Sequence, residues 1–337
     1  MIDRPRMAVI GLGKYGRNHV LAYSDYSACD LRMVCDIDVA RAEAMGKEFG
    51  VEWTCNVDEV LAAGIDAVGI ATPDYAHTDV ATRCLEAGKS VLVEKPLATS
   101  VAEAEGLLAA AEAAGVVAMV DFQNRWHPTF LQVRQLVEEG KIGRPSMGYV
   151  RLSNSITVAE EWLSWASRSG PEWYLLSHSL DLMCWILEDT PVSVYAVGSK
   201  GVLRGRGIDC WDELQALVRF RDSFVTFESS WIAPAGAPSV LDAQVSLYGD
   251  AGKVEFDWDY AGLSYVGERL EYPWAAGGSR DRYGRLSSHI FDSMRYFVDS
   301  VRGIVPAVAG FGDGVRNVKM IAAVIASLQS GAVVEFG

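Results

Sequence analysis

A glycine-rich turn near the N-terminus restricts the possible folds of this chain more than any other segment. Met7 to Ile10 is a short apolar run, typical of a strand buried on both faces, and Gly11, Gly13 and Gly16 follow it as G-x-G-x-x-G. The first glycine permits a tight turn, the second lets the backbone approach a pyrophosphate, and the third allows close packing of helix on strand. A helix expected from Asn18 to Tyr23 would direct free N–H groups at the phosphates.

The next apolar run indicates which dinucleotide this turn would bind. Leu31 to Cys35 ends in Asp36, twenty residues after Gly16, where a carboxylate is expected to meet the adenine-ribose hydroxyls. Because the same carboxylate would repel a 2′-phosphate, the sequence favours NAD over NADP. Arg41 keeps NADP open, since a nearby guanidinium could bind that phosphate. The cofactor-binding residues expected here are Gly11, Gly13, Lys14, Tyr15, Gly16, Asp36, Ile37 and Arg41.

The first 121 residues alternate strand-like apolar runs with helical stretches such as Val39 to Phe49 and Val101 to Ala114. This alternation predicts an α/β fold, with a Rossmann domain built on a doubly wound parallel sheet over residues 1–121. Ligands of such sheets bind beyond the carboxyl ends of the strands. Two further strand ends carry polar residues, so we expect Thr72, Pro73, Glu94 and Lys95 at the cofactor site.

Beyond residue 121 the pattern changes to strand-like stretches joined by short polar or glycine turns. Over residues 122–337 it predicts an α+β domain with a largely antiparallel, open sheet for substrate binding and oligomerisation. A helix from Trp173 to Leu187 interrupts the strands, and helices from Leu286 to Val301 and from Gly312 to Gln329 close the chain. A sheet exposed on one face would leave apolar area in water, which predicts a homodimer or homotetramer packed through it.

The balance of charges narrows the class of partner. The formal net charge is −14 and the isoelectric point about 4.8, so the overall field disfavours nucleic acid and anionic membranes. A small anionic substrate stays open, with Arg125 and Arg168 as candidate ligands for its carboxylate or phosphate. The cysteines form no C-x-x-C and no His/Cys cluster, so we expect no metal site. Without a signal-peptide or membrane-span pattern, we expect a cytoplasmic protein.

Four segments resemble the Gfo/Idh/MocA oxidoreductases, the glucose–fructose oxidoreductase and inositol dehydrogenase family. They are the nucleotide turn, Ala71-Thr-Pro-Asp-Tyr-Ala-His77, Glu94-Lys-Pro-Leu97 and Ser177-His-Ser-Leu-Asp181. The E-K-P signature is the most diagnostic of them, and the resemblance covers essentially the whole chain. It implies a Rossmann domain followed by an open-sheet domain, with the active site in the cleft between them. It also implies a cofactor site lined by Thr72, Pro73 and His77, with Gln123.

The resemblance further implies oxidation of a sugar or polyol hydroxyl, or the reverse reduction. In that chemistry Lys95 would bind the reacting hydroxyl and His178 would take its proton. The sequence departs from the family pattern at Tyr174, where an aspartate often stands four residues before the catalytic histidine. In one continuous helix, Tyr174, His178 and Asp181 would share a face. The substrate-binding residues expected are Tyr174, Asp181, Arg125, Trp165 and Arg168.

The first interpretation is an NAD-dependent dehydrogenase for a sugar, sugar acid or cyclitol. Two other functions stay open. A non-catalytic NAD-binding sensor or regulator on the same fold would be consistent with the missing carboxylate at position 174. A redox-neutral enzyme that oxidises its substrate only transiently, with NAD retained, would act as an epimerase, lyase or glycosidase. The sequence leaves open which sugar is bound, which carbon reacts and in which direction.

Overall fold

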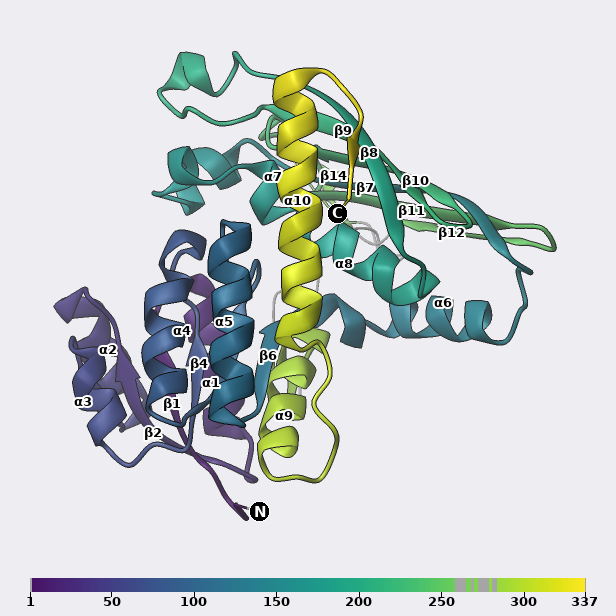
Figure 1. The fold of residues 1–337 in the computed structure, drawn as a ribbon. Helices are drawn as coiled ribbons and strands as arrows, with labels where there is room; N and C mark the ends of the chain where they lie inside the picture. The colour runs from purple at the N-terminus through teal and green to yellow at the C-terminus, as the bar shows by residue number, and fades with distance from the viewer. Residues whose placement is uncertain (1, 258–264, 268–269, 272–278, 281–283, 337) are drawn as a thin grey trace. The chain divides into compact units, whose positions relative to one another are not determined.

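The computed structural model describes residues 2–257, 265–267, 270–271, 279–280 and 284–336 (Figure 1). As far as they are described, residues 1–127 with 276–318 form one unit and residues 128–275 with 319–337 form another. Each unit has its own sheet and its own hydrophobic core. The division between the units falls inside α10 (Phe311–Ser330), after Val318.

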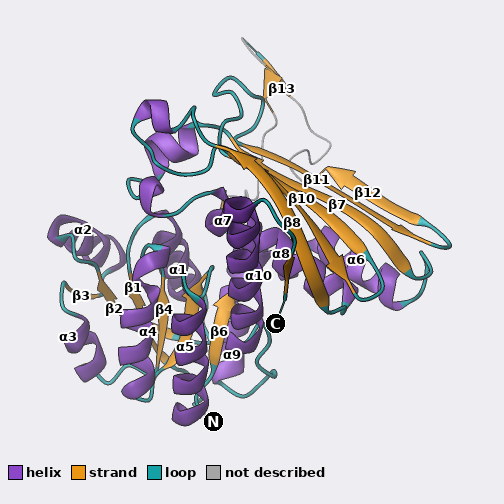
Figure 2. Cartoon of the chain, turned by 45° about the horizontal axis from the view of Figure 1, so that its top comes forward, coloured by secondary structure: helices purple, strands orange, loops and turns teal. Residues whose placement is uncertain are grey.

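The first unit is built on a six-stranded parallel sheet with the strand order β3-β2-β1-β4-β5-β6 (Figure 2). β4 and β5 are buried along their whole length, which explains why their sequences are nearly continuous apolar runs. This sheet confirms the predicted Rossmann fold class. The strands are β1 (Arg6–Ile10), β2 (Asp30–Cys35), β3 (Glu52–Thr54), β4 (Ala67–Ile70), β5 (Ser90–Glu94) and β6 (Ala118–Asp121).

Helices cover both faces of this sheet (Figures 1 and 2). Side chains of α1, α2 and α9 share one core with the strands, whereas α4 and α5 pack against each other. The helices are α1 (Lys14–Asp25), α2 (Val39–Phe49), α3 (Val57–Ala62), α4 (His77–Glu86), α5 (Val101–Ala114) and α9 (His289–Val301), with short 3-10 turns η1 (Asp74–Ala76) and η2 (Gln123–Trp126).

α2 and α5 begin and end where local sequence signals place them. The side chains of Asp38 and Ser100 accept the backbone N–H groups of Arg41 and Glu103, so both helices have a side-chain N-cap. Each helix ends at a glycine in the left-handed region, with φ +65° at residue 50 and +62° at residue 115. Both helices therefore have the bounds that their sequence pattern predicts.

α9 differs from its prediction in two ways. It starts at His289, because Leu286–Ser287 forms the short strand β16 and Ser288 caps the helix by accepting the Ile290 N–H. It also belongs to the first unit, whereas the sequence assigned all of residues 122–337 to the second domain. The reason is its apolar face, since Phe291 and Phe297 are fully buried in the core of the parallel sheet.

The second unit contains a seven-stranded sheet in the order β12-β11-β7-β10-β9-β8-β17. All neighbours are antiparallel except β7 and β10, which pair in parallel. The sheet confirms the largely antiparallel α+β prediction. Its strands are β7 (Pro145–Asn154), β8 (Pro191–Ser199), β9 (Glu213–Phe220), β10 (Phe224–Ser230), β11 (Leu241–Gly249), β12 (Lys253–Asp257) and β17 (Val334–Glu335).

The remaining strands are two-residue pieces, and part of one prediction cannot be compared with them. They are β13 (Tyr265–Val266), β14 (Leu270–Glu271) and β15 (Ser279–Arg280), in addition to β16. A strand was expected from Leu263 to Val266, but residues 263 and 264 lie outside the described residues.

One face of the seven-stranded sheet carries the core of the second unit. Val150, Val218, Phe227 and Leu247 are fully buried there in a core that also contains residues of α6, α8 and the C-terminal half of α10. The helical segments of this unit are α6 (Pro128–Glu138), η3 (Val158–Trp162), η4 (Ala166–Arg168), α7 (Pro171–Tyr174), α8 (Leu176–Leu187) and η5 (Arg204–Arg206). Among the described residues, no helix combines the length and apolarity needed to cross a membrane.

The prediction of a single helix from Trp173 to Leu187 is wrong in its continuity. The structure has two helices, α7 and α8, which meet at Leu175. The φ of −100° at Leu175 departs from ideal helical geometry, and the ring of Tyr174 packs among other aromatic side chains just before it. Tyr174 therefore closes one helix and His178 lies in the first turn of the next.

Candidate functional site

The nucleotide turn joins β1 to α1, and its glycines meet different steric limits. Gly11 has φ +87°, and a Cβ there would lie 2.6 Å from backbone atoms of Ala71. A Cβ on Gly16 would lie 1.8 Å from the carbonyl oxygen of Gly11, so only glycine lets α1 pack this closely. A Cβ on Gly13 would meet nothing described within 4 Å, which leaves that side of the turn open to a ligand.

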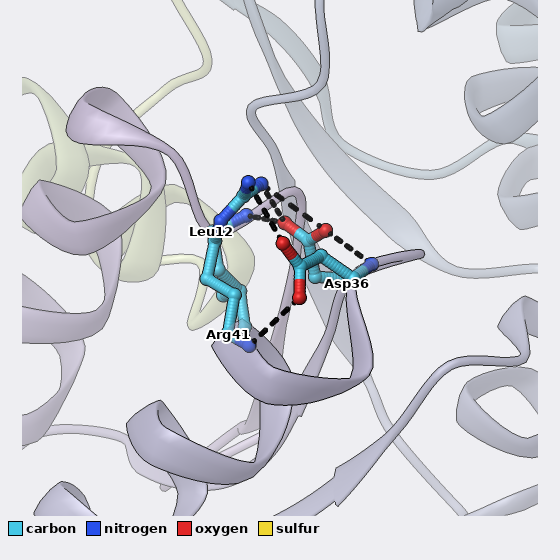
Figure 3. A network of polar contacts seen from close by, with 4 residues as sticks. Leu12, Asp36 and Arg41 are labelled. Atoms are coloured by element: carbon cyan, nitrogen blue, oxygen red, sulfur yellow. Dashed lines mark hydrogen bonds and ion pairs between the residues drawn. The ribbon is translucent and has the colours of Figure 1, made fainter.

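Asp36 follows β2, and its carboxylate organises the same turn (Figure 3). Oδ2 accepts the Leu12 N–H at 2.7 Å, and Oδ1 accepts the Asp38 N–H at 2.9 Å. Arg41 Nη1 donates to Oδ2 at 3.1 Å. Beside this buried carboxylate, Ile37 is 94% exposed. The carboxylate of Asp36 and the exposed apolar side chain of Ile37 thus lie together at the strand end where a dinucleotide places its ribose and adenine.

His77, the first residue of α4, holds two neighbouring strand ends together. Its Nδ1 lies 2.8 Å from the carbonyl oxygen of Pro96, and its Nε2 lies 3.0 Å from that of Thr72. The ring is almost fully buried, and burial lowers its pKa. His77 therefore fixes the loops after β4 and β5 relative to each other.

Two buried polar atoms at these strand ends lack a hydrogen-bond partner within the described part of the chain. They are the hydroxyl oxygen of Thr72 and the side-chain oxygen of Gln123. Buried polar atoms are rarely left unpaired in native proteins, so such atoms indicate a missing ligand or water. With the open turn at Gly13 and the carboxylate of Asp36, they fit a dinucleotide bound at the carboxyl ends of this sheet.

Lys95 follows the end of β5 and is only 5% exposed. Burial lowers the pKa of its ammonium group, while the nearby carboxylates of Glu94, Asp74 and Asp121 oppose that shift. A cation buried beside the candidate cofactor residues is unusual, because burying a charge costs free energy that nearby opposite charges must offset. Lys95 is therefore the strongest candidate for a group that acts on substrate in this unit.

The second unit presents a separate group of polar and aromatic side chains around α7 and α8. His178 and Asp181 are buried on α8. The ring of Tyr174 meets Trp165 and Trp231 edge-on, with 6.2 and 5.7 Å between ring centroids. α7 ends at Tyr174 and α8 begins at Leu176, so Tyr174 does not lie on the same helix as His178 and Asp181. Tyr174 instead belongs to an aromatic cluster.

The two arginines proposed for an anionic substrate differ in their surroundings. Arg125 is buried, donates to Asp313 at 3.0 Å and lies 5.4 Å above the ring of Phe122. An anionic substrate would have to compete with Asp313 for it. Arg168 lies in η4 and is exposed. Binding of substrate by either arginine stays a prediction.

Two buried titratable residues near Lys95 were not predicted from the sequence. His19 on α1 and Asp121 at the end of β6 are both fully buried. Nε2 of His19 lies 3.2 Å from Oε1 of Glu94 and 3.8 Å from Oδ2 of Asp121. Their signals were weak but present, since His19 stands three residues after the last glycine of the turn and Asp121 directly follows the apolar run from Val117 to Val120. Charged or titratable groups are seldom buried unless paired, so these two belong with the candidate catalytic lysine.

Models of known protein families match the sequence of both units. A family model described as the oxidoreductase family with an NAD-binding Rossmann fold matches residues 5–122. The model of the GFO/IDH/MocA C-terminal domain matches residues 130–255. The chain belongs to the Gfo/Idh/MocA oxidoreductase family. Its first unit is the NAD-binding Rossmann domain of that family, which confirms both the resemblance and the expected cofactor.

Individual Gfo/Idh/MocA proteins give further points of comparison. The chain is 33% identical to D-apiose dehydrogenase of Paraburkholderia graminis over 47% of this chain and 42% of that protein. It is 36% identical to scyllo-inositol 2-dehydrogenase (NAD(+)) of Bacillus subtilis over 43% of each. These matches thus span less than half the length of the curated relatives. The crystal structure of GenD2 from gentamicin A biosynthesis, in complex with NAD, has a TM-score of 0.88 and 25% identity, covering 100% of this chain and 97% of that one.

Proposed function

We propose that the protein is an NAD-dependent dehydrogenase that moves a hydride between nicotinamide and a hydroxyl of a sugar, sugar acid or cyclitol. The observation that carries this proposal is the buried Lys95 at a strand end of an NAD-binding Rossmann domain. Names of similar proteins, among them an apiose and an inositol dehydrogenase, support the substrate class.

The residues of the chain supply what hydride transfer requires besides the cofactor. Bound NAD would accept the hydride, and the protein would orient substrate and move one proton. In this proposal the ammonium group of Lys95 binds the reacting hydroxyl and stabilises the developing alkoxide, and His178 accepts the hydroxyl proton. Thr72, Gln123 and Asp36 would hold the cofactor through the polar atoms described above.

A second function is favoured by one observation only. Tyr174 stands where the family often has a carboxylate, and its ring is engaged with Trp165 and Trp231. A protein that binds NAD but has lost turnover, a sensor or regulator, would tolerate that replacement. The retained Lys95 and His178 favour the dehydrogenase over this alternative.

A substrate screen tests the proposal directly. Purified protein with NAD or NADP is offered a panel of sugars, sugar acids and inositols, and reduced nicotinamide is followed by its absorbance. Turnover of at least one polyol is the expected result. NAD binding measured by calorimetry, together with no turnover in either direction across the panel, would favour the sensor. Exchange of a substrate C–H hydrogen without net NADH formation would favour a redox-neutral reaction.

A further inference from the structure

Behind Lys95, the first unit buries three titratable side chains from three different elements. His19 of α1 is fully buried, as is Asp121 at the end of β6, and Glu94 at the end of β5 is 5% exposed. Nε2 of His19 lies 3.2 Å from Oε1 of Glu94 and 3.8 Å from Oδ2 of Asp121. The three side chains each have a nitrogen or oxygen within 4.8 Å of the others.

The two carboxyl groups of this cluster are neighbours by register. Glu94 pairs with Asp121 across the parallel strands β5 and β6, so their side chains leave the sheet on the same side. Neither oxygen of Asp121 has a hydrogen-bond donor in the described structure, since the nearby Ser293 hydroxyl of α9 donates to the carbonyl oxygen of Ile290 instead. A proton on one carboxyl group would supply that donor. Two carboxylates in a space closed to water cannot both remain ionised without a large cost.

His19 is not the group that holds this proton. The hydroxyl of Tyr23 lies 3.3 Å from Nδ1, so the O–H can donate to that nitrogen while Nε2–H donates to Glu94. This arrangement uses a neutral imidazole with one N–H. It agrees with burial, which lowers the pKa of His19 to about 4.

We propose that Glu94 and Asp121 share one proton, so that the pair carries a single negative charge facing the ammonium group of Lys95. The other titratable groups that interact with the pair are Tyr23 and His19 from α1 and Lys95 itself, and Lys95 in turn interacts with Asp74 from η1 and His77 from α4. Burial raises the pKa of both Glu94 and Asp121, in agreement with a proton held near neutral pH.

A proton fits this cluster better than a metal ion, although the three side chains include metal-ligand types. Lys95 already supplies one positive charge beside the carboxyl groups, so a divalent cation would add charge that only two carboxylates balance. The hydrogen bond from Tyr23 also orients His19 for donation to Glu94 rather than for a lone pair on Nε2.

The consequence for Lys95 rests on the proposed function. A lysine that must bind a hydroxyl and stabilise an alkoxide should stay charged in a buried place. One negative charge behind it favours the ammonium form without the cost of two adjacent carboxylates. Glu94 and Asp121 are positioning residues in this sense, since they act through Lys95.

Infrared spectroscopy of the ligand-free protein at pH 7 tests the shared proton itself. The wild type should show the carbonyl stretch of a buried, protonated carboxylic acid. That component should disappear from the difference spectra in both Glu94→Gln and Asp121→Asn. Asp66→Asn is the matched control, because the hydrogen bond from Arg6 lowers the pKa of Asp66 and keeps it ionised. Absence of the band from the wild type would overturn the proposal, even if the variants do not fold. So would a band that survives both substitutions.

Carbon-13 NMR of Lys95, assigned with Lys95→Met, tests the charge count. Each single substitution replaces a shared proton by an amide and leaves one negative charge, so the titration midpoint of Lys95 should change little. The double variant Glu94→Gln/Asp121→Asn removes that charge and should lower the midpoint by about 1–3 units. If each single substitution also lowered the midpoint clearly, with a further drop in the double variant, both groups would be ionised in the wild type and the proposal would fail. Neither measurement depends on turnover. The infrared and NMR results can therefore be interpreted even if the substrate screen finds no activity.

Discussion

Asp36 is the residue whose contacts bear most directly on cofactor choice. Its two oxygens accept the backbone N–H groups of Leu12 and Asp38 and also face Arg41 (Figure 3). A carboxylate fixed in this way faces the ribose side of the turn as a fixed negative charge. A 2′-phosphate there would meet that charge first, although Arg41 lies close enough to compensate in part.

We expect NAD to give a higher kcat/KM than NADP, and Asp36→Ser to narrow the difference. The reason is removal of the charge that repels the phosphate. Asp38→Ser is the control, since Asp38 caps α2 and contacts Arg41 but does not accept from the nucleotide turn. Steady-state kinetics with both cofactors measure the ratio. A wild type that prefers NADP would show that Arg41, rather than Asp36, decides the choice.

Lys95 and His178 are the two residues on which the proposed chemistry depends. Removal of a general base or of its electrostatic partner typically lowers the rate by ~10²–10⁴-fold. Lys95→Met and His178→Ala should therefore each lower kcat by that factor, while NAD affinity measured by calorimetry changes little. Variants with undiminished kcat on a substrate of the wild type would exclude these residues from the proton transfer.

Tyr174 distinguishes a substrate contact from packing. If its hydroxyl hydrogen-bonds substrate, Tyr174→Phe should cost roughly 0.5–1.5 kcal/mol, which is about a 2- to 13-fold loss in kcat/KM. If the ring only packs against Trp165 and Trp231, the substitution should be nearly silent, because the aromatic contacts persist. Comparison of kcat/KM for the two proteins on one substrate decides between the roles.

Among the elements, α9 carries a pH-dependent contribution to stability at its first turn. His289 begins the helix, is 9% exposed and meets the ring of His127 at 4.8 Å between centroids. Burial, with His127 nearby, lowers the pKa of His289 to about 3. The folded protein thus keeps this ring neutral at pH values where the unfolded chain, with a histidine pKa near 6.5, takes up a proton.

The sign of this linkage predicts a loss of stability on acidification. Between pH 7 and pH 5, His289 should lower the free energy of unfolding by roughly 2 kcal/mol, because only the unfolded state binds the proton in that window. His289→Gln should remove this part of the loss, whatever its effect at pH 7. Urea titrations of both proteins at the two pH values give the difference. An equal loss in wild type and variant would contradict the prediction.

At the scale of the whole molecule, the exposed face of the seven-stranded sheet is the feature that bears on assembly. β9 alternates exposed and buried residues along its length, so one face of the sheet is open. Register places Tyr195 beside Leu217 and Met147 beside Phe224, and each of these four is at least 40% exposed. Exposed apolar patches of this kind often mark contacts between proteins.

We propose a homodimer or homotetramer packed through this face. Light scattering at micromolar concentration should give a multiple of the chain mass of 36.7 kDa. Leu217→Arg should shift the protein towards the monomer, because it would bury a charge in the contact. Val308→Arg, at an exposed apolar residue of the first unit, should leave the mass unchanged. A monomeric wild type would refute the assembly.

The sequence by itself determined the features that depend on neighbouring residues. The capping residues and closing glycines fix the bounds of α2 and α5, and apolar runs mark most strands of both sheets. The steric roles of Gly11 and Gly16 also follow from the motif and its spacing. Each of these rests on local backbone preferences or on hydrophobic periodicity, which the order of residues encodes directly.

Only the tertiary structure decided which distant groups meet. It packs α9 on the parallel sheet, pairs β7 with β10 in parallel and divides the predicted helix at Leu175. It also brings His19 to Glu94, 75 residues away, and places Asp121 beside them. Contacts of this range depend on the packing of whole elements, and no pattern along the chain specifies that a histidine and two carboxyl groups will be buried together.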